Sequence, residues 1–135
     1  VINLHSGILP DYKGVMATFW AMRNKASHIG TTLHWIDNAR IDQGAIIGQT
    51  RQSVNYARSY FWNTCNLYAA GCAAMGQTVD ALAKAENPKA APQQAVGQYY
   101  SYPDQAALNT FAYPLWDAHD VLREWMPPNL TPTPD

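Results

Sequence analysis

The first 47 residues constrain the fold most, because strand-like and helix-like segments alternate along them. Residues 1–5 are an apolar run that ends at a turn-rich segment, as strands do. Apolar residues at three- and four-residue steps then predict an amphipathic helix over residues 15–25. Residues 31–37 and 45–54 are rich in strand-forming side chains. This alternation predicts an α/β fold with a mostly parallel sheet.

A second periodic stretch predicts one long helix over residues 57–86. Its apolar residues are spaced 4, 3, 4, 3, 4 and 3 apart, which places them on one stripe of a helix: Phe61, Cys65, Tyr68, Cys72, Met75, Val79 and Leu82. We expect this stripe to pack on the sheet, with a coiled-coil partner as the alternative.

Three polar side chains near the first strand suggest acyl-transfer chemistry. Asn3 and His5 alternate along the strand, so they share a face, and Asp42 lies in the polar loop 38–44. An amide donor stabilises a developing oxyanion by about 3 kcal/mol, and a histidine moves protons near neutral pH. A neighbouring carboxylate favours the charged imidazole and fixes its orientation. Together these residues would transfer an acyl group to an amine or to water.

Simpler interpretations of the same residues exist. Asn3 and His5 would serve equally as a hydrogen-bonded structural pair, and Asp42 precedes a glycine, as turn residues do. A metal site from His5, His34, Asp37 and Asp42 lacks any His-x₃-His or Cys-x₂-Cys spacing, so we predict no metal.

The composition argues against large charged partners. The net charge is −1 and only 14% of residues are charged, which makes nucleic acid and membrane unlikely partners. Cys65 and Cys72 lie seven residues apart on the predicted helix, about 10 Å and beyond disulfide reach. Free thiols are typical of a reducing compartment, so we predict a cytoplasmic protein.

The chain reads as one domain over residues 1–125, followed by a Pro-rich tail over residues 126–135. It opens inside an apolar strand, and a parallel strand needs neighbours on both sides. We therefore expect a partial domain whose N-terminal half is missing, with a homo-oligomer as the other way to cover that strand.

Several separated motifs follow one another in a recognisable order. They are Asn3-Leu4-His5, Leu9-Pro10, Tyr12 and Gly14, then Gly30-Thr31-Thr32-Leu33-His34 and Asp42-Gln43-Gly44-Ala45-Ile46-Ile47. Together they resemble the catalytic half of the folate-dependent formyltransferases. That family includes glycinamide ribonucleotide, methionyl-tRNA and amino-sugar formyltransferases and formyltetrahydrofolate hydrolase. The resemblance implies the C-terminal half of a Rossmann-like formyltransferase domain.

The resemblance also implies roles for individual residues. Asn3 would polarise the formyl oxygen, His5 would act as acid and base, and Asp42 would set the charge state of His5. The donor would be 10-formyltetrahydrofolate and the acceptor a small-molecule amine. The residues expected to line the folate pocket are Asn38, Ile41, Gln43 and Gly44. Those expected to support the catalytic groups are His34 and Thr32.

Two other functions remain open at this stage. The same residues would suit a 10-formyltetrahydrofolate hydrolase, and a non-catalytic accessory or assembly fragment would keep the fold without the reaction. The sequence also departs from the family pattern after His5, where Ser6-Gly7 replaces a frequent Pro-Ser. We expect little or no activity from these 135 residues alone.

Overall fold

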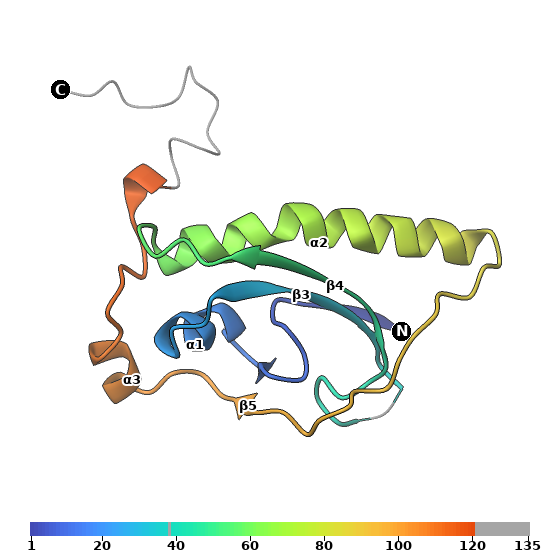
Figure 1. Ribbon diagram of the computed structural model, residues 1–135, viewed down its shortest axis with the longest axis horizontal. Helices are drawn as coiled ribbons and strands as arrows, with labels where there is room; N and C mark the ends of the chain where they lie inside the picture. The colour runs from blue at the N-terminus through green and yellow to red at the C-terminus, as the bar shows by residue number, and fades with distance from the viewer. Residues whose placement is uncertain (38, 121–135) are drawn as a thin grey trace, which may run out of the picture.

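The computed structural model describes residues 1–37 and 39–120. Its centre is a sheet in the order β1-β3-β4, made of β1 (Ile2–His5), β3 (His28–Trp35) and β4 (Ile46–Ser53). One long helix, α2 (Tyr60–Ala83), runs along β3 and β4 on one side of this sheet (Figure 1). The other elements are short: β2 (Lys13–Gly14), α1 (Ala17–Arg23), β5 (Tyr99–Tyr100) and α3 (Gln105–Asn109).

The central sheet is antiparallel, which corrects the predicted mostly parallel sheet. Both β1–β3 and β3–β4 pair antiparallel, and a parallel pair occurs only between β2 and β5. A parallel pair needs a crossover that carries the chain back along the sheet. Here α1 has seven residues and spans only about 10 Å. The register pairs His5 with Thr32, so β3 begins beside the end of β1 and no crossover is needed.

The amphipathic helix α1 supplies much of the core, as its spacing predicts. Phe19 and Met22 are both fully buried. The Phe19 ring stacks on that of Phe111, with centroids 4.3 Å apart, which ties α1 to the segment after α3. Hydrophobic burial of this kind contributes about 1.5–3 kcal/mol per large side chain.

The long helix is confirmed over Tyr60–Ala83, but its buried face differs from the predicted stripe. The buried residues are Asn63, Leu67 and Gly71, whereas Tyr68 and Val79 are exposed. Gly71 lets the helix approach the sheet, since a methyl group there would lie within about 3 Å of a Thr31 side chain. Asn63 is polar and Gly71 has no side chain, so the spacing of hydrophobic residues did not indicate this face of the helix.

The chain after α2 returns to the start of the domain. The peptide N–H of Lys13 donates to Gln98 at 2.9 Å, and that of Val15 donates to Tyr100 at 3.0 Å. An isolated bridge joins Ile46 to Ala91. These contacts place residues 91–100 alongside β2 and the start of β4, which becomes important for the candidate site.

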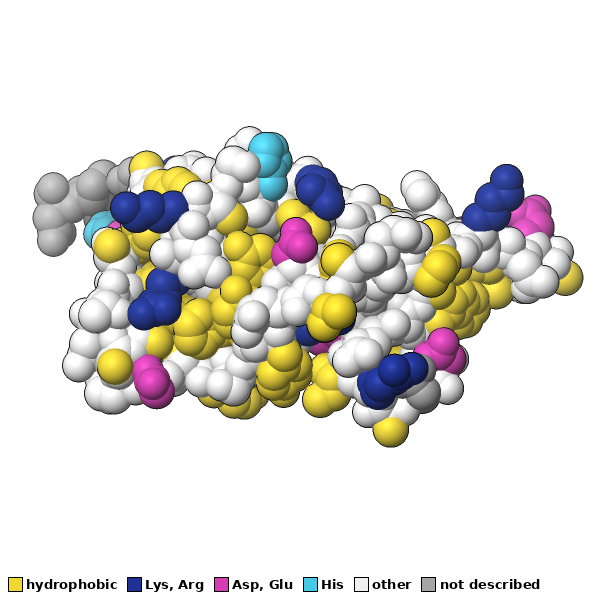
Figure 2. Space-filling model, turned by 60° about the horizontal axis from the view of Figure 1, so that its bottom comes forward, with side chains coloured by type: hydrophobic (Ala, Val, Ile, Leu, Met, Phe, Trp, Pro, Cys, Tyr) yellow, Lys and Arg dark blue, Asp and Glu magenta, His cyan; other side chains and the backbone are white. Residues whose placement is uncertain are grey.

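Two predictions concern residues that the structure does not describe. The predicted Pro-rich tail over residues 126–135 and the predicted folate-pocket residue Asn38 both lie outside the described residues. Within the described part, no helix is both long and apolar enough to span a bilayer. On the face drawn in Figure 2, Lys, Arg, Asp and Glu side chains of the described residues are scattered among apolar ones.

Candidate active site

Asn3 and His34 form the base of a polar cluster on the central sheet. They face one another across β1 and β3, with Asn3 Nδ2 3.1 Å from His34 Nε2. His5 follows two positions after Asn3 and therefore lies on the same face. The antiparallel register thus gathers an amide and two imidazoles, because opposite and next-but-one residues share a face.

Asp42 completes the cluster from the loop between β3 and β4. Its Oδ2 lies 3.5 Å from His5 Nδ1, and its Oδ1 lies 3.4 Å from His34 Nε2. The peptide N–H of Gly14 donates to Oδ2 at 2.7 Å. The carboxylate is 8% exposed and stands between two imidazoles that are 7% and 2% exposed. One carboxylate therefore orients both histidines.

The segment after α2 holds this loop in place. The carboxamide nitrogen of Gln93 donates to the Asp42 carbonyl at 2.7 Å and to the Gly44 carbonyl at 3.0 Å. Gln93 is 51 residues from Asp42 in the chain, and no pattern in the sequence pointed to it. A single side chain thus fixes the backbone on both sides of Gln43.

The imidazole of His34 has a partner in either protonation state. Its Nδ1 lies 3.0 Å from the Trp35 carbonyl, and a carbonyl only accepts, so Nδ1 carries the hydrogen. The other nitrogen, Nε2, accepts from Asn3 when the ring is neutral and donates to Asp42 when it is charged. His34 is therefore equipped to gain and lose a proton at Nε2.

Opposing effects act on the pKa values of this pair. Burial disfavours the charged form of His34, but the hydrogen bond to Asp42 and the Trp35 carbonyl outweigh it and raise its pKa. Burial also opposes ionisation of Asp42. Its hydrogen bonds with His34 and the Gly14 peptide outweigh that effect and lower the Asp42 pKa. Both shifts favour the charged pair.

His5 is held differently from His34. Its Nε2 lies 2.6 Å from the Tyr12 carbonyl, so this nitrogen donates, while Nδ1 faces Asp42. Gly7 is buried against the same ring, because a methyl group at Gly7 would lie 2.6 Å from Nε2. The loop after β1, including the Ser6-Gly7 departure from the family pattern, therefore packs directly on His5.

A hollow of about 330 Å³ opens beside the cluster. Asn3, His34 and Asp42 line it together with Asp37, Arg40 and Ile41 among others. Its volume lies within the range of small-molecule sites, about 300–1,000 Å³. An acyl group in this hollow would meet the Asn3 amide, the Asp42 carboxylate and the His34 imidazole, whereas His5, the predicted acid and base, is not among the residues that line it.

Comparison with known proteins finds a family to which part of the chain is similar. Residues 1–60 match the model of the formyl transferase family, a segment that contains every member of the cluster. This match covers fewer than half of the 135 residues, and it shows that residues 1–60 are similar to the formyltransferases.

Three formyltransferases illustrate the likeness. The methionyl-tRNA formyltransferase of Flavobacterium psychrophilum is 32% identical over 81 residues, which are 60% of this chain and 25% of that protein. The GDP-perosamine N-formyltransferase of Brucella melitensis is 37% identical over 60 residues, 44% of this chain and 23% of that protein. The chain therefore spans about a quarter of the length of these relatives.

The third is a solved structure. The N-formyltransferase of Helicobacter canadensis, in complex with folinic acid and dTDP-3-aminofucose, matches with a TM-score of 0.69 at 27% identity. The match covers 76% of this chain and 38% of that one. It supports an α/β formyltransferase fold over more of the chain than the first 60 residues.

The other predicted site residues lie around the cluster. Ile41 lines the hollow, Gln43 lines a second hollow on the other side of the loop, and Gly44 is buried. The Thr32 hydroxyl donates to the Gly7 carbonyl at 2.7 Å and so supports the loop after β1. Among the described residues, no three His, Cys, Asp or Glu side chains are arranged as metal ligands.

Gly44 is a position where only a glycine fits. A methyl group there would fall on the Trp35 carbonyl, whereas one on Gly48 would meet nothing within 4 Å. We expect Gly44→Ala to lower the free energy of unfolding by about 1–3 kcal/mol, as overpacking does. Gly48→Ala is the matched control and should change it by less than about 1 kcal/mol. Urea unfolding of both variants measures this, and equal stabilities would contradict it.

The charged pair predicts how stability depends on pH. A raised His34 pKa stabilises the fold below the unfolded value of about 6.5, and this contribution is lost as pH rises through the folded value. A lowered Asp42 pKa stabilises above about 3.9 and is lost as pH falls through the folded value. The pair therefore contributes most between about pH 4 and 6.5.

We expect the melting temperature of the wild type to exceed that of His34→Gln by the widest margin near about pH 5.5, and by less at about pH 8. Thermal unfolding followed by circular dichroism across this range tests the sign. His28→Gln, which alters an exposed histidine outside the cluster, is the matched control. A margin for His34→Gln that grows towards the alkaline end would contradict the assignment.

Proposed function

We propose that the intact protein transfers a formyl group from 10-formyltetrahydrofolate to the amino group of a nucleotide-linked amino sugar. The family match supports formyl transfer. The Helicobacter canadensis enzyme, a 27% identical relative in structure, was solved with folinic acid and an aminofucose nucleotide. The observation that carries the proposal is the Asp42 carboxylate held between His5 and His34 beside the Asn3 amide.

The reaction would proceed by attack of the acceptor nitrogen on the formyl carbon. The carbonyl oxygen becomes an oxyanion, which the Asn3 amide stabilises by donating a hydrogen bond. The nitrogen loses a proton, the bond from the formyl carbon to N10 of the folate breaks, and N10 gains a proton. His5 would move these protons, and Asp42 would stabilise its charged form.

His34 adds to this proposal. It lines the hollow with Asn3, and its Nε2 exchanges between an acceptor and a donor role without losing a partner. We assign it the support of Asp42, whose ionised form it stabilises. For the donor, Ile41 faces the same hollow as the reactive groups, whereas Gln43 and Gly44 would contribute through the loop that they shape.

The test is a transfer assay with the intact protein, 10-formyltetrahydrofolate and a panel of nucleotide-linked amino sugars. Tetrahydrofolate release that requires an acceptor, with the acceptor gaining one formyl group by mass spectrometry, is expected. Release without any acceptor would instead establish a hydrolase. No release with any acceptor, from protein that remains folded, would overturn the proposed reaction.

A further inference from the structure

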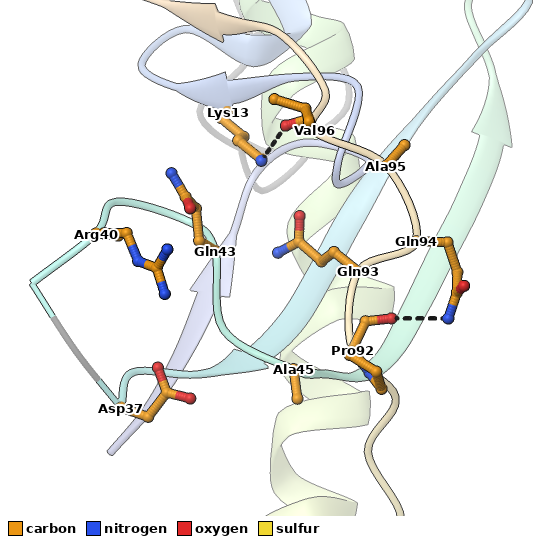
Figure 3. Close-up of a pocket in the computed structure, with 10 residues that line it drawn as sticks. All are labelled: Lys13, Asp37, Arg40, Gln43, Ala45, Pro92, Gln93, Gln94, Ala95 and Val96. Atoms are coloured by element: carbon orange, nitrogen blue, oxygen red, sulfur yellow. Dashed lines mark hydrogen bonds between the residues drawn. The ribbon is translucent and has the colours of Figure 1, made fainter.

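A second hollow, of about 470 Å³, lies between the loop that carries Asp42 and the segment 92–96. Figure 3 shows the side chains of Lys13, Gln43 and Gln93 directed into the same space, with the Arg40 guanidinium at its side. Asp37 lines its far end. Three polar side chains from three separate segments therefore converge on one hollow, with two cations and one carboxylate among the residues that line it.

Lys13 is the unusual residue in this hollow. It is 5% exposed, and its ammonium donates to the Val96 carbonyl. An ammonium has three hydrogens to donate, and among the described residues no carboxylate lies within 4.0 Å of it. A buried charge is costly unless it is paired. The ammonium thus faces the hollow with donors to spare and without a counter-ion from the described chain.

Gln93 adds a second unsatisfied group. Its amide nitrogen faces two carbonyl oxygens, of Asp42 and Gly44, which fixes the orientation of the amide. Its Oε1 is buried and has no partner among the described residues. Buried acceptors without a partner are rare in native proteins and indicate a ligand or water. This oxygen would accept from a hydroxyl or N–H of whatever occupies the hollow.

The hollow is directly connected to the reactive cluster. Lys13 precedes Gly14, whose peptide N–H donates to the Asp42 carboxylate, and Gln93 holds the Asp42 carbonyl. Asp37 and Arg40 line both hollows. A ligand bound in the second hollow would therefore lie across one loop from the groups proposed to perform the transfer.

We propose that this hollow binds an oxyanion, a phosphate or a carboxylate, of a small-molecule substrate, with Lys13 as its charge partner and the Gln43 amide as a neutral hydrogen-bond donor; Gln93, whose amide hydrogens bond the Asp42 and Gly44 carbonyls, holds the wall of the hollow. The inference rests on the proposed function, which supplies two sources of such an oxyanion. These are the phosphates of a nucleotide-linked acceptor and the glutamate carboxylates of the folate donor. Lysine binds both as a point charge, and charge-assisted hydrogen bonds are about twice as strong as neutral ones.

The experiment measures anion binding directly and needs no turnover. Inorganic phosphate and glutarate are titrated separately into the intact protein. The amide shifts of Gly14, next to Lys13, and of Gly97, next to Val96, are followed by NMR. At least one of the two should give saturable shifts. Preference for phosphate assigns the site to the acceptor, and preference for glutarate assigns it to the folate tail. Because no formyl transfer is involved, a failed titration does not affect the transferase proposal, and an inactive enzyme does not affect this one.

Three variants and a control make the result decisive. Lys13→Met should weaken binding by about tenfold or more, and Lys13→Arg should retain it. Gln43→Glu changes an exposed loop residue, adds a carboxylate to the hollow and should also weaken binding by about tenfold. It remains informative if Lys13→Met does not fold. Lys84→Met, at the exposed end of α2, should bind as the wild type does.

Two results would overturn the proposal. The first is that neither anion shifts the amides of Gly14 and Gly97 in the wild type. The second is that both anions bind equally well to the wild type and to Gln43→Glu, which would place them elsewhere on the surface.

Discussion

Replacement of Asp42 by Asn is expected to lower kcat for formyl transfer in the intact protein by at least about 10²-fold. The amide is nearly the same size, and its oxygen still accepts from the Gly14 peptide, which now bonds the carboxylate at 2.7 Å. What is lost is the negative charge beside His5 Nδ1 and His34 Nε2. Without it, neither imidazole is stabilised in its charged form during proton transfer.

A second readout separates this effect from simple misfolding. Because the hydrogen bond and charge of Asp42 raise the pKa of His34, Asp42→Asn should lower that pKa. An NMR titration of the His34 ring measures it. Asp11→Asn, which removes the same charge from an exposed loop, should leave both kcat and the His34 titration unchanged. A kcat for Asp42→Asn within tenfold of the wild type would rule out the proposed role of the carboxylate.

The residues of the cluster were predictable from the sequence because they lie in short motifs. Asn3 and His5 alternate along a strand, and this fixes their common face whichever way the neighbouring strand runs. The predicted parallel direction of the sheet was wrong, yet the antiparallel register also brings His34 opposite Asn3. The chemistry of the site therefore depends on strand alternation and on the loop to Asp42, more than on the direction of the sheet.

The walls of the site were not predictable in the same way. Gln93 bonds to carbonyls 49 and 51 residues away, and a side-chain amide that meets a backbone oxygen leaves no periodic trace in the sequence. Lys13 lies in the turn-rich run after the first strand, yet the pairing of β2 with β5 leaves it only 5% exposed. Contacts of this kind depend on tertiary packing, which overrides local pattern.

The long helix illustrates the same limit inside one element. Its length followed from the spacing of its apolar residues, and the structure confirms it over Tyr60–Ala83. Its orientation depended instead on Gly71 and Asn63, a small residue that permits close approach and an amide that bonds the Asn55 carbonyl at 2.9 Å. Neither contributes to a hydrophobic stripe, so the predicted stripe was rotated away from the actual contact.

Replacement of His5 by Ala separates an enzyme from a non-catalytic assembly module. If His5 moves protons in the reaction, kcat in the intact protein should fall by at least about 10²-fold while the protein remains folded. His5→Gln refines the test, because glutamine still donates to the Tyr12 carbonyl, now 2.6 Å from Nε2, but does not exchange protons near neutral pH. His28→Ala, which replaces an exposed histidine, is the control.

An assembly module would show no formyl transfer in the wild type, and its His5→Ala variant would lose only partner binding. Unchanged transfer in His5→Gln would reassign the proton transfer to His34, which lines the reactive hollow with Asn3.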